Sequence, residues 1–229
     1  MKLLAIETST EACSVAVHVD GEVIERHELA PRRHTQLVLP WAEELLAQAG
    51  LAKSQLDAIA VGRGPGAFTG VRLAIAITQG LALALDRPVL AVSTLAVLAM
   101  QGQGDHILAA IDARMGEVYV GRFRREDDGL VQAADAESVC APASVPLPGS
   151  SLHGVGTGFA AESGALAARL GDLLVGFDGQ ALPRASHLAR LAVRAFTRGE
   201  AIAADALEPA YLRDKVALTL AEQGKPTPR

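Results

Sequence analysis

The beginning of the chain carries the alternating hydrophobic pattern of β-strands. Residues 3–6 form a continuous apolar run, and between residues 13 and 19 apolar side chains occupy every second position. An Asp20-Gly21 pair favours a two-residue turn between this segment and a third one at residues 23–29. The pattern therefore predicts an antiparallel meander of three strands.

Helical spacing and short apolar runs then alternate. Apolar residues recur every three or four positions through residues 35–49, before Gly50, although Pro40 is expected to kink or delay this helix. Strands predicted at residues 56–61 and 88–92 alternate with helices at residues 69–85 and 94–100. The order βββαβαβα indicates a mixed α/β domain.

The second half of the chain repeats this opening. The apolar run that ends at Asp112 aligns with the apolar run that ends at Glu7, and each run is followed by an alternating segment and an Asp-Gly pair. A repeat spacing of roughly 100 residues indicates a domain duplication, because solenoid units are about 20 to 50 residues long. We therefore expect one domain at residues 1–102 and a second at residues 103–229.

The second copy is expected to be abbreviated. It degrades into a connector rich in proline and serine at residues 140–151. A helix is predicted at residues 159–170, a strand at 173–177 and an amphipathic helix at 184–198. This last helix either stays with its own domain or crosses back to the first one, and the polar tail after Leu218 is expected to fray.

Composition excludes several classes of protein. Half of the 229 residues are apolar, which is enough for a substantial core. The net charge is −5 and aromatic residues make up 3%, so the chain is not expected to bind nucleic acid by itself. The two cysteines lack metal-site or disulfide spacing, and the longest apolar run is too short to span a bilayer. Because the first residues also lack a signal-peptide core, these features favour a cytoplasmic protein without membrane contact.

The glycine-rich segment GRGPGAFTGVR, at residues 62–72, raises the question of a phosphate cradle. Gly62, Gly64 and Ala67 match a dinucleotide-binding fingerprint, which would indicate a Rossmann oxidoreductase. However, Pro65 removes a backbone N–H donor, and no acidic residue ends a second βα strand to bind a ribose. A Walker motif requires a Gly-Lys-Ser/Thr sequence, and no lysine lies between Lys53 and Lys215. A tight turn that sets the angle of the next helix explains these residues better.

Several segments of the chain resemble known proteins when they are taken together. The two tandem modules look like the actin and sugar-kinase superfamily of duplicated RNase H-like βββαβα domains. More narrowly, the chain resembles the TsaB family of bacterial tRNA threonylcarbamoyladenosine biosynthesis. The matching segments are LLAIETSTEACSVAV, HTQLVLP, GRGPGAFTGVR, QGLALA, IDARMGEVY and EPAYLRD, which extend from residue 3 to residue 214.

The resemblance implies a non-catalytic, partner-stabilising subunit. TsaB proteins join TsaD, a catalytic relative of similar fold, and TsaE, an ATPase. Together they transfer threonylcarbamoyl from its adenylate to N6 of the adenosine beside the anticodon of certain tRNAs. The resemblance further implies a homodimer when TsaD is absent, tRNA contact only through the complex and no intrinsic cofactor. A nucleotide, ATP or ADP, is expected only at the interface with the partner.

The resemblance also implies that helices 35–49 and 69–85 form the subunit contact. The helix at residues 69–85 carries one row of small residues at four-residue intervals, Gly70, Ala74, Thr78 and Ala82, and a second row, Ala76, Gly80 and Ala84. Such rows permit a close approach of another helix. The alternative is that both helices only cover their own sheet. The expected interface residues are Leu37, Val38, Trp41, Leu45, Gly70, Ala74, Thr78 and Ala82.

Candidate reactive groups are few. TsaD proteins hold a metal through two histidines four residues apart, whereas the histidines here are at least seven residues apart, so neither a metal site nor a catalytic residue is expected. Glu7 and Asp112 occupy positions where the superfamily orients a nucleotide-bound Mg²⁺, so the alternative function is an ATP-dependent phosphotransferase or hydrolase. Both acids also fit a role as strand-end caps, and GVGTG at residues 154–158 also fits a plain turn. The candidate nucleotide contacts are Glu7, Thr8, Ser9, Asp112, Gly154, Gly156 and Gly158.

Overall fold

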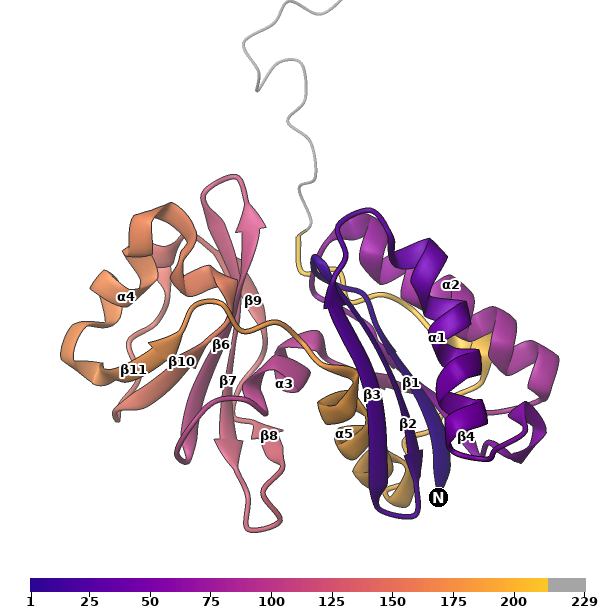
Figure 1. The fold of residues 1–229 in the computed structure, drawn as a ribbon. Helices are drawn as coiled ribbons and strands as arrows, with labels where there is room; N and C mark the ends of the chain where they lie inside the picture. The colour runs from indigo at the N-terminus through magenta and orange to yellow at the C-terminus, as the bar shows by residue number, and fades with distance from the viewer. Residues whose placement is uncertain (214–229) are drawn as a thin grey trace, which may run out of the picture.

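The protein folds into two β-sheets with helices between them and on their outer faces (Figure 1). The computed structural model describes residues 1–213. The fold is mixed α/β, as the order of predicted elements indicated. The tail after Leu218, which was expected to fray, lies outside the described residues.

The first sheet contains the predicted meander and the two strands that follow it. Its strand order is β3-β2-β1-β4-β5, in which β1 is antiparallel to β2 and parallel to β4. Two helices, α1 (His34–Gln48) and α2 (Phe68–Leu85), cover its outer face and bury a continuous apolar core. The strands are β1 (Lys2–Glu7), β2 (Ala12–Val19), β3 (Glu22–Leu29), β4 (Ala58–Gly62) and β5 (Val89–Val92).

Helix α1 runs unbroken through Pro40, at which the sequence predicted a kink or a delayed start. Pro40 lies on the exposed side of the helix. The carbonyl group that loses its N–H partner there can therefore bind water, which limits the cost of proline inside the helix.

The second sheet has the corresponding strand order, β11-β10-β6-β7-β8, and β9 also pairs with β7. Its central strand β6 is antiparallel to β7 and parallel to β10. Helix α4 (Ala165–Leu170) covers the outer face together with the buried ring of Phe159. The strands are β6 (His106–Arg114), β7 (Glu117–Arg125), β8 (Val131–Ala133), β9 (Ser138–Cys140), β10 (Leu152–Val155) and β11 (Leu174–Asp178).

The helix predicted over residues 159–170 is wrong in its first half. Only α4 is a regular α-helix, and the residues before it form two short 3-10 turns. Glu162 and Ser163 have φ values of 47° and 56°, and Gly164 follows at 81°. Three successive residues in the left-handed region interrupt the helical backbone, although the apolar spacing runs on through them.

Helices α3 (Thr94–Ala99) and α5 (Ala185–Thr197) fill the space between the sheets (Figure 1). α5 packs against β1, β2 and β5 of the first sheet, whereas α3 packs against β6 and β7 of the second. Both helices belong to one hydrophobic core, which includes Leu95, Leu98, Leu188 and Ala192. Of the two placements that the sequence left open for the last helix, the structure has the one that crosses back to the first half.

A largely buried acid fixes the start of α5 on the first sheet. The carboxylate of Glu25 on β3 accepts hydrogen bonds from the Ser14 hydroxyl at 2.9 Å, the Ser186 backbone N–H at 2.9 Å and the Arg184 guanidinium at 2.6 Å. Burial by itself would raise the pKa of Glu25. The hydrogen bonds from Ser186, Arg184 and Ser14 and the charge of Arg184 outweigh burial and hold this pKa below its ordinary value of 4.5.

Replacing Glu25 by glutamine should lower the free energy of unfolding at neutral pH by about 1 to 2 kcal/mol, because charge-assisted hydrogen bonds become neutral ones. A carboxyl with a lowered pKa stabilises the folded state fully above pH 4.5 and loses that contribution as the pH falls through the folded-state pKa. Urea unfolding should therefore show a difference between wild type and Glu25→Gln that shrinks below pH 4.5. Exposed Glu22 on the same strand supplies the control variant Glu22→Gln. A difference that does not depend on pH would contradict this role for Glu25.

Candidate functional site

A cleft of about 800 Å³ opens between the two halves of the molecule. The turn after β1 and the start of α2 line it from the first half, the end of β6 and residues 157–161 line it from the second, and residues 209–213 complete it. A cavity of this size can hold a small molecule. The polar residues of its wall are Ser9, Thr10, Glu11, Arg72, Asp112, Arg114, Tyr119, Thr157, Gln180, Tyr211 and Arg213.

The guanidinium of Arg72 lies near the faces of two aromatic rings, those of Phe68 and Tyr211, and all three residues line this cleft. Its Cζ atom is 3.2 Å from the centroid of the Phe68 ring and 5.0 Å from that of the Tyr211 ring. Arg72 also donates a hydrogen bond to the Tyr211 hydroxyl. The aromatic faces stabilise the cation, while both rings stay largely exposed, so the rim is aromatic and locally positive.

Residues 209–213, here called the crossing segment, run across the cleft from the first half to the second. On the first side, the Ala210 N–H donates to the carbonyl oxygen of Arg63 at 2.8 Å. On the second side, Arg213 donates to the Glu117 carboxylate at 2.6 Å and to the carbonyl oxygen of Ala113 at 3.1 Å. The crossing segment therefore ties the two halves together.

Glu7 lies beneath the cleft and not in it. The residue is 1% exposed, and its carboxylate accepts hydrogen bonds from the Ser9 backbone N–H at 2.7 Å and from the Thr94 hydroxyl at 3.3 Å. Burial raises the pKa of Glu7 above its ordinary value of 4.5, and the hydrogen bonds from Ser9 and Thr94 offset only part of that rise. Glu7 thus connects the end of β1 to the start of α3 inside the protein.

Asp112 lines the cleft, but Arg114 already engages its carboxylate. The Arg114 guanidinium lies 2.9 Å from one carboxylate oxygen, and the Arg114 backbone N–H donates to the other at 2.7 Å. A nucleotide-bound Mg²⁺ shared by both acids would require the two carboxylates to face one space. Because Glu7 is buried and Asp112 is paired, these residues do not fit that arrangement. Within residues 1–213, no group of three histidine, cysteine or acidic side chains could hold a metal ion.

The glycine-rich loop at residues 62–66 uses its backbone N–H groups inside the protein. The Gly64 N–H donates to the Thr94 hydroxyl at 3.2 Å, and the Ala67 N–H just after the loop donates to the carbonyl oxygen of Ser9 at 2.7 Å. In the first turn of α2, a Cβ atom at Gly70 would lie 2.0 Å from the carbonyl oxygen of Thr8. The loop therefore allows α2 to approach β1 closely, which agrees with the tight-turn interpretation, and these donors are not free for a phosphate.

The second glycine-rich turn packs against β6. A Cβ atom at Gly156 would lie 2.3 Å from the carbonyl oxygen of Ala110, and one at Gly158 would lie 2.7 Å from the Ala110 Cβ. Between these glycines, the Thr157 hydroxyl accepts a hydrogen bond from the Asp112 backbone N–H at 3.2 Å and lines the cleft. The turn thus serves packing. Thr8 is buried, Gly154 lies within β10, and of the candidate nucleotide contacts only Ser9 and Asp112 line the cleft.

The row of small residues expected at the subunit contact faces inward instead. Seven of the eight expected interface residues are buried in the protein's own core, against β1, β2 and β4, and Leu37 is partly exposed. The side of α2 that carries this row faces the sheet, because small side chains allow the helix backbone to approach the strands most closely. The buried residues are Val38, Trp41, Leu45, Gly70, Ala74, Thr78 and Ala82.

The opposite side of α2 is apolar and open. Its second row of small residues, Ala76, Gly80 and Ala84, here called the outer row, is exposed, and Leu83 beside it is 70% exposed. The helix has a mean hydropathy of 1.6, and by length and composition alone it could cross a bilayer. Only 28% of its residues are buried within the protein, so most of this apolar helix is at least partly exposed. One side of α2 packs on the sheet, and no other element among residues 1–213 covers its exposed apolar side.

The residues that make the rim of the cleft aromatic and positively charged were not predicted as a group. Arg72 and Tyr211 are 139 positions apart, and no local pattern relates them. Both lie in segments that carried the family resemblance, GRGPGAFTGVR and EPAYLRD. The signal that could have directed attention to Tyr211 and Arg213 is their place in a segment without helix or strand periodicity, where aromatic and arginine residues indicate contacts more often than core packing.

Known proteins are similar to this chain over nearly its whole length. Residues 23–220 match the family model described as TsaD, tRNA N6-adenosine threonylcarbamoyltransferase. The chain is 42% identical to the tRNA threonylcarbamoyladenosine biosynthesis protein TsaB of Escherichia coli, over 95% of this chain and 96% of that protein. The protein of the same name from Haemophilus influenzae is also 42% identical, over 94% of this chain and 95% of that protein. The solved structure of YeaZ from Pseudomonas aeruginosa matches with a TM-score of 0.85 and 46% identity, over 92% of this chain and 99% of that one.

Proposed function

Because this chain belongs to the TsaB family of tRNA threonylcarbamoyladenosine biosynthesis proteins, we propose that it acts as a non-catalytic subunit that stabilises its partner in the modifying complex. In this proposal, the complex transfers threonylcarbamoyl from threonylcarbamoyl-AMP to N6 of the adenosine beside the anticodon. The partners are a catalytic TsaD-like subunit and a TsaE-like ATPase in the cytoplasm. The chain forms a homodimer when it is alone and meets tRNA only through the complex.

The open side of α2 is the observation that carries this proposal. The outer row consists of small residues, so a partner helix can approach its backbone to about 8 to 10 Å between axes. Leu83 on α2 and Leu39 on α1, which are 70% and 45% exposed, add apolar area on the same two helices. A face of this kind gains free energy when a second protein covers it. The interface thus involves the two helices that the resemblance indicated, through other residues than those expected.

We also infer that the fold is a tandem duplication of RNase H-like domains of the actin and sugar-kinase type, at residues 1–102 and 103–229. The common strand order of the two sheets supports this inference, as do the acids Glu7, at the end of β1, and Asp112, two residues before the end of β6. In the second copy, the connector at residues 140–151 replaces the helix that corresponds to α1, and α4 is a shortened counterpart of α2. α3 and α5 are the corresponding helices of the inner layer.

The alternative functions find less support in the site. An ATP-dependent phosphotransferase or hydrolase would need Glu7 and Asp112 at one metal ion, and Glu7 is buried under its own hydrogen bonds. A nicotinamide oxidoreductase would need free N–H groups in the loop at residues 62–67, and those of Arg63, Gly64 and Ala67 are used internally. We therefore assign the chain no cofactor of its own and place a nucleotide, ATP or ADP, only at the boundary with the TsaD-like partner.

Reconstitution of tRNA modification tests the proposed function. We expect purified TsaD-like and TsaE-like proteins to incorporate threonylcarbamoyl into tRNA with this chain present and to lose that activity when it is omitted. This chain without its partners should incorporate none. Incorporation by the chain alone, or an unchanged rate in its absence, would contradict the proposal. Micromolar Mg-ATP binding that Asp112→Ala removes would support the enzymatic alternative.

A further inference from the structure

A second cavity, of about 450 Å³, lies next to the cleft between the two halves of the molecule. Leu212 of the crossing segment lines both spaces. Side chains from both sheets and from α5 form its walls, and part of the wall is apolar, with Phe123, Val131 and Leu191. Its volume is within the range of sites that hold small organic ligands.

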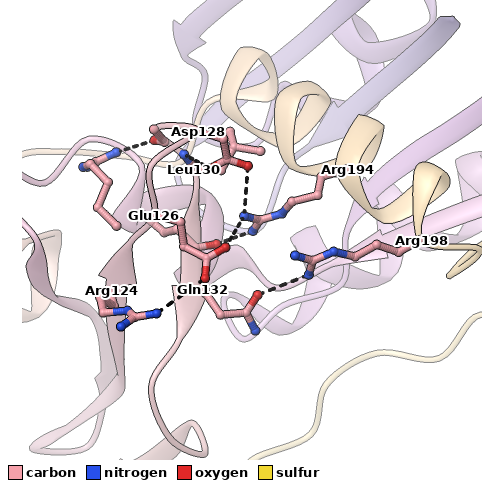
Figure 2. Close-up of polar contacts among 10 residues, drawn as sticks. Arg124, Glu126, Asp128, Leu130, Gln132, Arg194 and Arg198 are labelled. Carbon is pink, nitrogen blue, oxygen red and sulfur yellow. Dashed lines mark hydrogen bonds and ion pairs between the residues drawn. The ribbon is translucent and has the colours of Figure 1, made fainter.

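Three arginines line this cavity, and they differ in how their charges are compensated. Arg194 has a structural role, because its guanidinium lies 3.5 Å from Glu126 and 3.7 Å from Asp128 in the hairpin between β7 and β8 (Figure 2). Arg198, one turn further along the chain, donates a hydrogen bond to the neutral amide oxygen of Gln132 at 3.3 Å (Figure 2). No carboxylate lies within ion-pair distance of Arg198 in the described part of the chain.

Arg63 is the third arginine of the cavity. Its backbone is fixed, since its N–H donates to the carbonyl oxygen of Val92 at 2.9 Å and its carbonyl oxygen accepts from Ala210 at 2.8 Å. Its guanidinium, in contrast, makes neither a hydrogen bond nor an ion pair with any of residues 1–213. Two guanidinium groups with unused N–H donors, on Arg63 and Arg198, thus border one space.

The acids of the cavity compensate these charges only in part. They are Glu137 and Glu200. Glu137 bonds to the Ser93 hydroxyl, and burial raises its pKa, which the hydrogen bond from Ser93 and the charge of Arg63 offset only in part. This carboxyl therefore accepts a proton more readily than an exposed one, and in its neutral form it can donate a hydrogen bond to an anion.

We propose that this cavity binds a small phosphate monoester, with the guanidinium groups of Arg63 and Arg198 holding the phosphate. Guanidinium matches the oxygens of a phosphate with paired N–H donors, and two of them balance a dianion. The Gln132 amide nitrogen adds a neutral donor, and the apolar wall at Phe123 and Leu191 borders the organic part of the ligand. The inference goes beyond the proposed function and does not rest on it.

Calorimetric titration of the full chain tests this site with three probes: inorganic phosphate, glycerol 3-phosphate and succinate. We expect saturable binding of glycerol 3-phosphate that weakens about tenfold or more in Arg63→Gln and in Arg198→Gln, because each substitution removes a charge-assisted hydrogen bond. Arg190→Gln is the matched control, since Arg190 is an exposed arginine of the same helix that does not line the cavity. Thermal unfolding of each variant by circular dichroism checks the fold, which the backbone hydrogen bonds of Arg63 should preserve.

The outcomes separate the sources of the anion. If inorganic phosphate binds as tightly as glycerol 3-phosphate and is weakened equally by Arg63→Gln and Arg198→Gln, the cavity is a phosphate site to which the organic group adds no affinity. Tighter binding of succinate than of either phosphate would overturn the ligand class. An absence of saturation at about 10 mM ligand, or an equal loss in Arg190→Gln, would overturn the site itself.

Discussion

Replacing Ala76 by glutamate is expected to abolish the proposed association of this chain with a TsaD-like partner and to convert the proposed homodimer to a monomer. Ala76 lies in the exposed outer row of α2, so the new carboxylate remains in water in the free chain. In a helix–helix contact it would be buried without a partner, which costs several kcal/mol. A loss of about 3 kcal/mol weakens association more than 100-fold. Light scattering and co-purification measure both effects.

Two variants show whether the outer row is the surface involved. Ala136→Glu makes the same change at an exposed position of the second half and should leave association unaltered. Ala74→Glu makes it in the row that packs against the protein's own sheet, where Ala74 is fully buried, and should unfold the chain. If Ala76→Glu bound its partner normally, the contact would have to lie elsewhere on the surface.

Replacing Glu7 by alanine is expected to lower the free energy of unfolding by about 2 to 4 kcal/mol. The substitution leaves a cavity in the core and deprives the Ser9 N–H and the Thr94 hydroxyl of an acceptor. Glutamine should be tolerated at this position, because its amide oxygen can accept from Ser9 and its amide nitrogen can donate to the Thr94 hydroxyl. Glu11→Ala, at an exposed position of the same turn, is the control.

The pH dependence of Glu7→Gln distinguishes a buried structural acid from a metal ligand. A carboxyl whose folded-state pKa is raised binds its proton more tightly in the folded state, so it favours folding at low pH and disfavours it as the pH rises from 4.5 through the folded-state pKa. The stability of Glu7→Gln relative to wild type should therefore increase over that range and then level off. Reconstituted tRNA modification should continue with Glu7→Gln. Loss of that activity with unchanged stability would instead indicate a direct role in catalysis.

Local pattern was sufficient for most of the secondary structure. Alternation over residues 13–19, the Asp20-Gly21 turn and helical spacing up to Gly50 predicted β2, β3 and α1 to within one or two residues. These signals are properties of a few neighbouring residues. The break at residues 162–164 was missed, because non-glycine residues adopt a left-handed backbone when the surrounding structure requires it, and Glu162 and Ser163 carry no local sign of this.

The sequence by itself determined the order of strands and helices, the two rows of small residues on α2 and the segments that carry the family resemblance. Only the tertiary structure decided which of these rows faces inward. Periodicity separates the two sides of a helix, but it does not say which side meets the sheet. The row that contains Gly70 faces the sheet, because Gly70 approaches Thr8 more closely than any larger residue could. It also decided that Glu7 is buried and that Arg63 and Arg198 border one cavity. Residues distant in the chain become neighbours only when the sheets and helices pack, and no local pattern records that packing.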